Sequence, residues 1–249
     1  MLKRAQPALD GQDKSMIWLL GASCLREFEE ILLLAGNGFG TGATKLMRSF
    51  YERTVTLSYL ASEPGQIERF IGYSAIHWHQ MLVEAEEIHL QFTISAAARQ
   101  KIVDDYETAK SAYKDEKCPT CKRRPQMSWT KTAMKEMASK VSESIRLLCF
   151  NAYQTPTFHL HTTHWGILNQ CEKSDGGKLR FSGGKVQEDA AQDAFDQAYL
   201  LLTQVADVLD HVFALDLGER LKQCGEDWLT AGEAVAASRV QGDAPSGGV

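Results

Sequence analysis

Apolar residues recur along most of this chain with the period of an α-helix. In residues 40–61 they recur at steps of three and four residues, which is typical of an amphipathic helix: Ala43, Leu46, Met47, Phe50, Leu57 and Ala61. A second set keeps the same period on an adjacent face: Arg48, Glu52, Val55 and Tyr59. A helix with both an apolar stripe and an ordered polar ladder is typical of the middle of a domain.

Comparable patterns predict helices on both sides of residues 40–61. A first helix is expected from Ser15, as its N-cap, to the stop signal Gly36-Asn37-Gly38. Pro64 is placed to start the next helix. The remaining helices are predicted over residues 66–89, over 96–114 with Ser95 as cap, over 128–144, over 187–215 with Gly218 closing it, and from there to about 230.

These elements predict an all-α fold. No alternating strand pattern and no 20–50-residue repeat interrupts the helical period. We therefore expect one helical domain over residues 15–230, a bundle of about seven or eight helices. Residues 1–14 are expected to be a flexible N-terminus and 231–249 a disordered tail, with an irregular CxxC loop at 117–127 and a flexible loop or short hairpin at 172–186.

Composition and charge narrow the class of protein. The chain has 249 residues, of which 44% are hydrophobic, and a formal net charge of -5. An acidic balance weakens non-specific binding to nucleic acid but leaves room for a local basic patch. No apolar run approaches the ~18 residues of a transmembrane helix, and no apolar segment follows Lys3 and Arg4 as in a signal peptide. We expect a cytoplasmic protein without a membrane segment.

Cys118 and Cys121 form the one spaced pair among six cysteines. The CxxC spacing supplies two ligands, whereas a closed zinc site needs four, so distant histidines or another subunit would have to complete it. A redox-active CxxC needs a helix N-terminus in a βαβ setting, which a helical pattern does not provide. Two free loop thiols and a zinc site are both compatible with the sequence.

Five histidines fall into two short segments, His77 and His79 in the first and His159, His161 and His164 in the second. They could converge on a metal ion or on a substrate phosphate, or they could be separate histidines on polar helix faces. Glu86 and His89 have the ExxH spacing of di-iron bundles, but no second ExxH accompanies them.

The basic run Lys122-Arg123-Arg124 is the densest positive patch. It could hold RNA or a phosphate, with Trp129 stacking on a base, or it could be a solvated loop.

Several of these residues carry a resemblance to a large bacterial family of uncharacterised helical proteins, a domain of unknown function. The shared positions are Gly40-x-Gly-Ala-x-x-Leu-Met-Arg48-Ser-Phe-x-Glu52, then Tyr59-Leu60, Pro64, Glu68-Arg69-Phe70, Ser128-Trp129 and Tyr153-x3-Thr157-x3-His161-x-Thr163. In the last segment the family has serine where this chain has Thr157 and Thr163, which keeps the hydroxyl. The resemblance covers residues 15–215, and the Arg48/Glu52 block is its most specific part.

The architecture of that family is also similar to HEPN proteins, helical bundles that include ribonucleases of toxin and phage-defence systems. The resemblance implies an Arg-x4–6-His motif that activates the 2′-hydroxyl and stabilises the phosphate. The nearest case here, Arg69 and His77, has seven residues in between, so the motif itself is not present. The implied activity on RNA therefore rests on similarity of fold.

Our leading hypothesis is a HEPN-like protein that acts in stress or phage defence on RNA. The expected site consists of Arg48, Glu52 and His161, surrounded by Tyr59, Arg69, Tyr73, His77 and Tyr153. His161 would be the acid–base group, Arg48 or Arg69 would bind phosphate, and Glu52 would orient one of them.

The competing interpretation is an Arg48–Glu52 pair that only holds helices together within a hydrogen-bond network. A non-enzymatic module that binds a protein partner and a small zinc protein are further alternatives. The sequence also leaves open whether the chain forms a homodimer.

Overall fold

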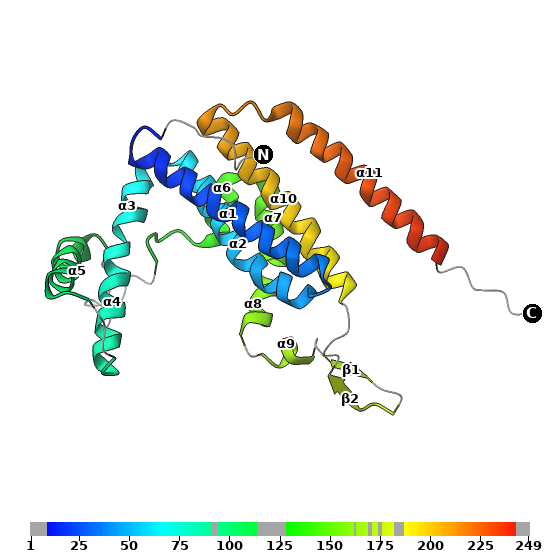
Figure 1. Cartoon of the computed structure of the whole chain (residues 1–249), viewed down its shortest axis with the longest axis horizontal. Helices are drawn as coiled ribbons and strands as arrows, with labels where there is room; N and C mark the ends of the chain where they lie inside the picture. The colour runs from blue at the N-terminus through cyan, green and yellow to red at the C-terminus, as the bar shows by residue number, and fades with distance from the viewer. Residues whose placement is uncertain are drawn as a thin grey trace, which may run out of the picture.

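Three long helices form the centre of the fold. The computed structural model describes residues 9–90, 94–113, 128–161, 163–168, 171–173, 176–181 and 187–242. Within them, α1 (Gln12–Gly36), α2 (Gly40–Ser62) and α10 (Glu188–Phe213) lie side by side (Figure 1). Each contributes apolar side chains to one core, which includes Ile31, Phe50 and Leu201.

Helix α2 is the central element of this core. Every residue from Thr54 to Leu60 is buried, so the second half of the helix is enclosed on all sides. It packs against α1 and α10, and also against the π-helix η4 (Cys149–Gln154) and the helices α6 (Met134–Val141) and α8 (Thr155–Leu160). A helix enclosed in this way belongs in the interior of a domain. The mid-domain position that the pattern predicts for residues 40–61 is confirmed.

The turn between α1 and α2 is fixed by the start of α10. Gly40 lies so close to this helix that a Cβ atom there would be 2.6 Å from the carbonyl oxygen of Gln187 and 2.7 Å from the amide nitrogen of Ala191. The side-chain oxygen of Gln187 accepts hydrogen bonds from the amide and the hydroxyl of Thr41, at 2.7 and 2.6 Å. Gln187 therefore satisfies one of the amides that the first turn of α2 leaves unpaired.

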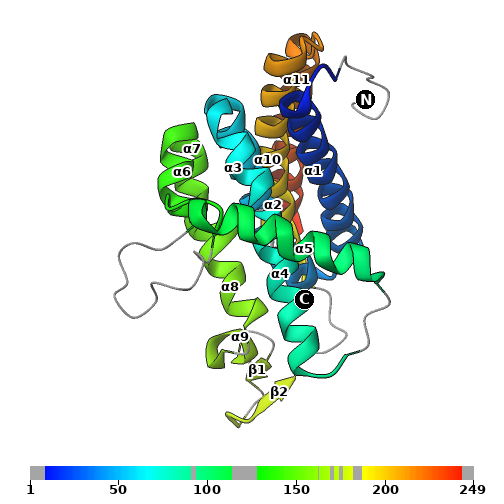
Figure 2. The same ribbon diagram turned by 90° about the vertical axis from the view of Figure 1, so that its left-hand side faces the viewer.

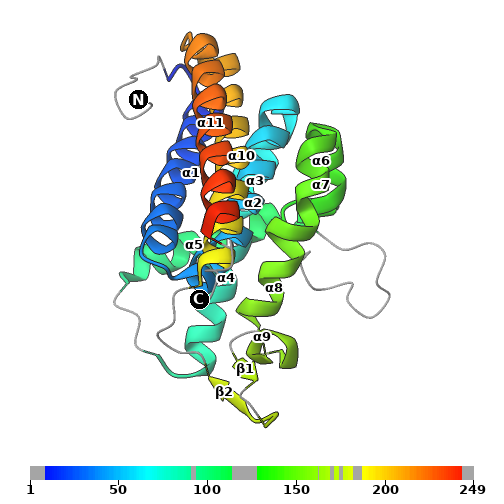
Figure 3. The same ribbon diagram turned by 90° about the vertical axis from the view of Figure 1, so that its right-hand side faces the viewer.

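A second layer of shorter elements covers the other side of α2. It comprises α6, α7 (Glu143–Leu148), η4, α8 and α9 (His164–Leu168), and it leads to a hairpin of β1 (Cys171–Lys173) and β2 (Leu179–Phe181) (Figure 3). The two strands are antiparallel, with Cys171 opposite Phe181. Of the two possibilities for residues 172–186, the described part forms the short hairpin.

The segment after α2 projects away from the three-helix centre (Figures 1 and 2). It consists of η2 (Pro64–Gln66), α3 (Ile67–Gly72), α4 (Ser74–Glu87), α5 (Ala96–Ala109) and η3 (Lys110–Tyr113). The projection has a small core of its own, formed by Tyr73, Ile76 and Tyr113. Pro64 starts η2, and the hydroxyl of Ser95 accepts from the amide of Ala98, as the sequence predicts.

The all-α bundle is confirmed, but several helix limits differ from the prediction. Helix α1 begins at Gln12, so Ser15 lies inside its first turn, where its hydroxyl donates to the carbonyl oxygen of Gly11. Residues 66–89 form two helices with a break at Tyr73 rather than one. Residues 128–133 are not helical, and the carbonyl oxygen of Trp129 accepts from Nε of Arg69 instead of from a helical amide.

The C-terminal end also differs. Helix α10 ends at Ala214, which adopts the left-handed conformation (φ 49°), while Gly218 opens the next helix instead of closing this one. That helix, α11 (Gly218–Gly242), continues well past the limit near residue 230 that the sequence predicts. Its extension is rich in alanine, the best helix former, which explains why small residues there do not end the helix.

The predicted CxxC loop at 117–127 and residues 1–8 and 243–249 lie outside the described residues. Within the described part of the chain, no helix combines the length and the apolar composition that crossing a bilayer requires.

Candidate functional site

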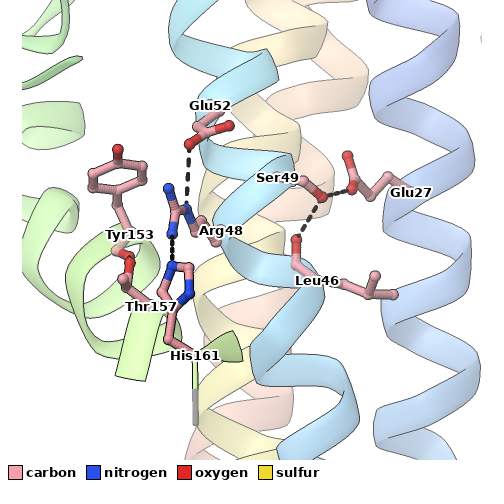
Figure 4. A network of polar contacts seen from close by, with 8 residues as sticks. All are labelled: Glu27, Leu46, Arg48, Ser49, Glu52, Tyr153, Thr157 and His161. Carbon is pink, nitrogen blue, oxygen red and sulfur yellow. Dashed lines mark hydrogen bonds and ion pairs between the residues drawn. The ribbon is translucent and has the colours of Figure 1, made fainter. Parts of the chain in front are cut away.

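Arg48, Glu52 and His161 meet on one side of α2 (Figure 4). The Nε atom of Arg48 lies 3.3 Å from Oε1 of Glu52, one turn further along the helix. The Nη1 atom of the same guanidinium lies 3.4 Å from Nε2 of His161, which directly follows α8. The three side chains that the sequence nominates as a site are therefore in contact, and Arg48 is the residue that joins the other two.

A π-helix brings the second half of the site to Arg48. Tyr153 lies in η4, and its ring centroid is 5.0 Å from Cζ of Arg48. The hydroxyl of Thr157 donates to the carbonyl oxygen of Tyr153 at 2.6 Å, and the amide of His161 donates to the carbonyl oxygen of Thr157 at 3.0 Å. Tyr153, Thr157 and His161 thus occupy successive turns that face α2. The wide turn ends just before Pro156, which has no N–H to continue the regular ladder.

The cluster is open to solvent rather than sealed in the core. The side chains of Arg48 and Glu52 are 24% and 38% exposed, and His161 is exposed. Because a guanidinium can only donate hydrogen bonds, Nε2 of His161 must accept here, which places the proton of the neutral ring on Nδ1. The site thus offers a cation that can bind an oxyanion next to an imidazole nitrogen that can take up a proton.

A groove of ≈ 680 Å³ runs beside this cluster. Glu52 and Tyr153 form part of its wall, and Arg53, Thr56, Phe70 and residues 128–134 form much of the rest. The indole of Trp129 packs edge-on against Phe70, with ring centroids 5.2 Å apart. The groove therefore combines an aromatic surface with hydroxyl groups and side chains of both charges.

Tyr59 does not belong to the exposed cluster. It lies eleven residues beyond Arg48 on α2, about three turns away, and is only 4% exposed. Its ring packs against Trp129, with centroids 6.1 Å apart, and Nζ of Lys140 lies 5.6 Å from the ring centroid. Tyr59 is a core residue that supports the aromatic wall of the groove.

Arg69, Tyr73 and His77 are gathered at the base of the projecting segment. Arg69 donates from Nε to the carbonyl oxygen of Trp129 at 2.8 Å and from Nη1 to that of Ala112 at 2.9 Å. The ring of Tyr73 meets the ring of His77 edge-on, with centroids 4.6 Å apart, and burial raises the pKa of the Tyr73 phenol. Arg69 thus joins α3 to the segment that carries Trp129 and to η3, while the Tyr73–His77 contact lies within the start of α4. None of these contacts involves the Arg48 cluster.

Glu27, Ser49 and Arg53 form a second polar network, between α1 and α2, that the sequence did not predict. Glu27 of α1 is 4% exposed and accepts a hydrogen bond from the hydroxyl of Ser49 (Figure 4). It also forms an ion pair with Arg53 at 2.7 Å. Burial raises the pKa of Glu27 more than the hydrogen bond from Ser49 and the charge of Arg53 lower it. A signal was present, because Glu27 falls on the apolar stripe of α1 between Cys24 and Ile31.

The histidine segments do not form a metal site. Among the described residues, no three His, Cys, Asp or Glu side chains are close enough to hold a metal ion. His79 stacks on Tyr106, with ring centroids 3.7 Å apart, while His161 contacts Arg48. Cys118 and Cys121, the pair expected for zinc, lie outside the described residues.

Cys24 and Cys149 are buried, and desolvation raises the pKa of Cys24 to about 12. The Cys24 thiol is therefore protonated at neutral pH and a poor nucleophile.

A family model described as "Family of unknown function (DUF5677)" matches residues 15–178. The matched region includes the whole Arg48, Glu52, Tyr153 and His161 cluster, and the chain belongs to this family. No curated protein and no solved structure shows a significant match to the chain.

Proposed function

We propose that this member of DUF5677 binds single-stranded RNA in the groove beside Arg48 and cleaves its backbone, with His161 as the acid–base group. The observation that carries the proposal is the 3.4 Å contact between Arg48 and His161 on a solvent-exposed surface. The two residues come from segments that are remote in the sequence, and their meeting supplies the two functions that cleavage needs.

Each residue has a role that follows from its chemistry. When the substrate phosphate takes over the N–H that Arg48 donates to Nε2, His161 Nε2 takes the proton from the 2′-hydroxyl. The 2′-oxygen bonds to phosphorus, and the 5′-oxygen departs with the proton that His161 returns. The products are a 2′,3′-cyclic phosphate and a free 5′-hydroxyl. Arg48 stabilises the negative charge that develops on the phosphate oxygens, and Glu52 holds the guanidinium in place.

The groove suits the remaining parts of such a substrate. Trp129 offers an aromatic face on which a base can stack, and Ser128, Thr130 and Thr132 offer hydroxyl groups for the 2′-hydroxyls of RNA. Lys131 adds a positive charge to the wall, whereas Arg53 is paired with Glu27 and Glu52 is acidic, and the chain as a whole carries a net charge of -5. Binding should therefore be local and should weaken with salt.

The proposed setting is the cytoplasm, in stress or phage defence. This cellular role is inferred from the resemblance to HEPN proteins. Because the Arg-x4–6-His motif of those proteins is absent, Arg48 and His161 would have to perform its functions.

An RNA cleavage assay tests the proposal. The purified chain and its His161→Ala variant are incubated with a labelled single-stranded RNA, and cleavage is expected to fall by about 10²–10⁴-fold in the variant. His164→Ala is the matched control, because His164 is also exposed, lies three residues away and starts α9. Equal cleavage by wild type and His161→Ala, or products without a cyclic phosphate end, would contradict the proposal.

A second candidate function is the binding of a protein partner through α4. Trp78, Met81 and Ile88 on the projecting segment are 55%, 49% and 72% exposed, which leaves apolar surface there for a partner to cover. If the chain binds no RNA and Trp78→Ala abolishes association with a cellular protein, this function replaces the first.

A further inference from the structure

A separate cavity lies between α1, α10 and α11, away from the Arg48 cluster. Its volume is ≈ 250 Å³, and its wall is mainly aliphatic, with Leu25, Leu202, Ala206, Leu217 and Leu221. For comparison, an apolar cavity of about 150 Å³ is enough to bind benzene. The space is therefore sufficient for a small ligand, and its lining favours an apolar one.

One polar group of the wall has an unmet hydrogen bond. Among the described residues, the hydroxyl of Tyr199 is buried without a hydrogen-bond partner. The ring cannot easily turn away, because it stacks on Trp228 with centroids 4.1 Å apart and an interplanar angle of 3°. Leaving a buried hydroxyl unpaired costs about 1–3 kcal/mol, so a ligand atom that accepts its proton would gain affinity.

The charged residues at the rim of the cavity indicate which ligand group would accept the hydrogen bond from Tyr199. Arg220 and Cys224 line the cavity from successive turns of α11, and both residues are exposed. Burial raises the pKa of Tyr199, and the nearby Cys224 and Asp227 raise it further, so the phenol keeps a proton to donate. Glu29 disfavours an anionic group on the α1 side, whereas Arg220 favours one on the α11 side, where Asp227 lies near Tyr199 but does not line the cavity.

We propose that this cavity binds a medium-chain carboxylate, whose carboxylate lies between the Arg220 guanidinium and the Tyr199 hydroxyl. The alkyl chain then fills the aliphatic part of the cavity. A volume of ≈ 250 Å³ is well above the ~150 Å³ that accommodates benzene, which makes a saturated chain such as that of octanoate a suitable probe. The proposal is independent of any activity at Arg48, because none of these residues belongs to that cluster.

Calorimetric titration of the full chain with octanoate tests this site. Arg220→Gln is expected to weaken binding by at least about tenfold, and Tyr199→Phe by a similar factor, because each removes one partner of the carboxylate. Lys222→Gln is the matched control, since Lys222 is an exposed cation on the same helix that does not line the cavity. Leu221→Trp should abolish binding by filling the space.

Two further measurements test whether the Tyr199→Phe variant is folded and whether octanoate binds through its charge rather than as a detergent. Tyr199→Phe should melt at the same temperature as the ligand-free wild type or slightly above it, because it removes the unpaired hydroxyl. Octanol, which has the same chain but no charge, should bind at least about tenfold more weakly than octanoate. No saturable binding of octanoate, equal losses in Arg220→Gln and Lys222→Gln, or equal affinity for octanol would each overturn the proposal.

Discussion

Nη1 of Arg48 and Nε2 of His161 lie 3.4 Å apart, although 113 positions separate the two residues in the chain. Arg48 also holds Glu52 on its own helix and faces the ring of Tyr153. One guanidinium therefore links α2 to the segment formed by η4 and α8. An Arg48→Ala variant separates the structural contribution of this link from its catalytic contribution.

Replacing Arg48 by alanine is expected to affect both stability and cleavage. The variant loses the pair with Glu52, the contact with His161 and the packing on Tyr153, so we expect a loss of about 1–2 kcal/mol in the free energy of unfolding. RNA cleavage should fall by at least about 100-fold, since a donor to the developing charge is removed. Urea denaturation and the cleavage assay measure the two effects.

Arg26→Ala provides the matched control for this variant. Arg26 and Glu30 form the same type of pair one turn apart at 3.4 Å, but the Arg26 side chain is 84% exposed. Its removal should cost less than about 0.5 kcal/mol and leave cleavage unchanged. Equal losses of stability in the two variants would show that Arg48 is no more than a surface ion pair.

Glu27 should make the stability of the protein depend on pH. Its pKa in the folded state is raised above the ordinary 4.5, so folding favours the protonated carboxyl group. The associated stabilisation is complete below pH 4.5 and is lost as the pH rises through the folded-state pKa. Relative to wild type, Glu27→Gln should therefore gain stability above this range and show little difference below it.

Urea denaturation of both proteins at a series of pH values measures this difference. Glu30→Gln is the control, because Glu30 is exposed and lies on the same helix. If the difference between Glu27→Gln and wild type did not change with pH, Glu27 would have to be ionised in the folded protein as readily as in the unfolded chain.

Gly40 should be intolerant of a side chain. A Cβ atom at this position would overlap the backbone of Gln187 and Ala191, and backbone atoms cannot turn aside as a flexible side chain could. We expect Gly40→Ala to lose about 1–3 kcal/mol of stability, the usual cost of overpacking. Gly36→Ala is the control at the other end of the turn, where nothing lies within 4 Å, and it should be neutral. Thermal melting of the two variants distinguishes a specific clash from a general need for glycine in this turn.

Local patterns were sufficient for most of the helices and for part of the site. The Arg48–Glu52 pair follows from the four-residue spacing alone, because residues one turn apart meet on any helix. His161 was selected with them through the family resemblance, and the structure brings it into contact. Tyr59 shares the period and Arg69 the resemblance, but both pack elsewhere, since neither signal says which neighbour a side chain will meet.

Other features depended on interactions that no local pattern contains. Residues 128–133 have an apolar and polar pattern compatible with a helix, yet the guanidinium of Arg69 holds the carbonyl group of Trp129. The ion pair between Glu27 and Arg53 joins two helices, and an isolated glutamate on an apolar stripe only hints at it. The cavity beside Tyr199 exists because α11 packs over α10 and α1 without filling the space between them.

By itself, the sequence determined an all-α chain with a central helix at residues 40–61 and a polar ladder on that helix. These properties arise from the spacing of side chains along one helix, which involves only residues that are close in the sequence. The tertiary structure decided that Arg48 and Glu52 of this ladder are open to solvent while Val55 and Tyr59 are buried, that His161 joins Arg48, and that a groove runs beside them. These three features depend on the π-helix η4, on Pro156 and on the packing of α8 against α2, which together turn Tyr153 and His161 toward Arg48. The spacing of residues along a single helix contains no information about how a distant segment packs against it.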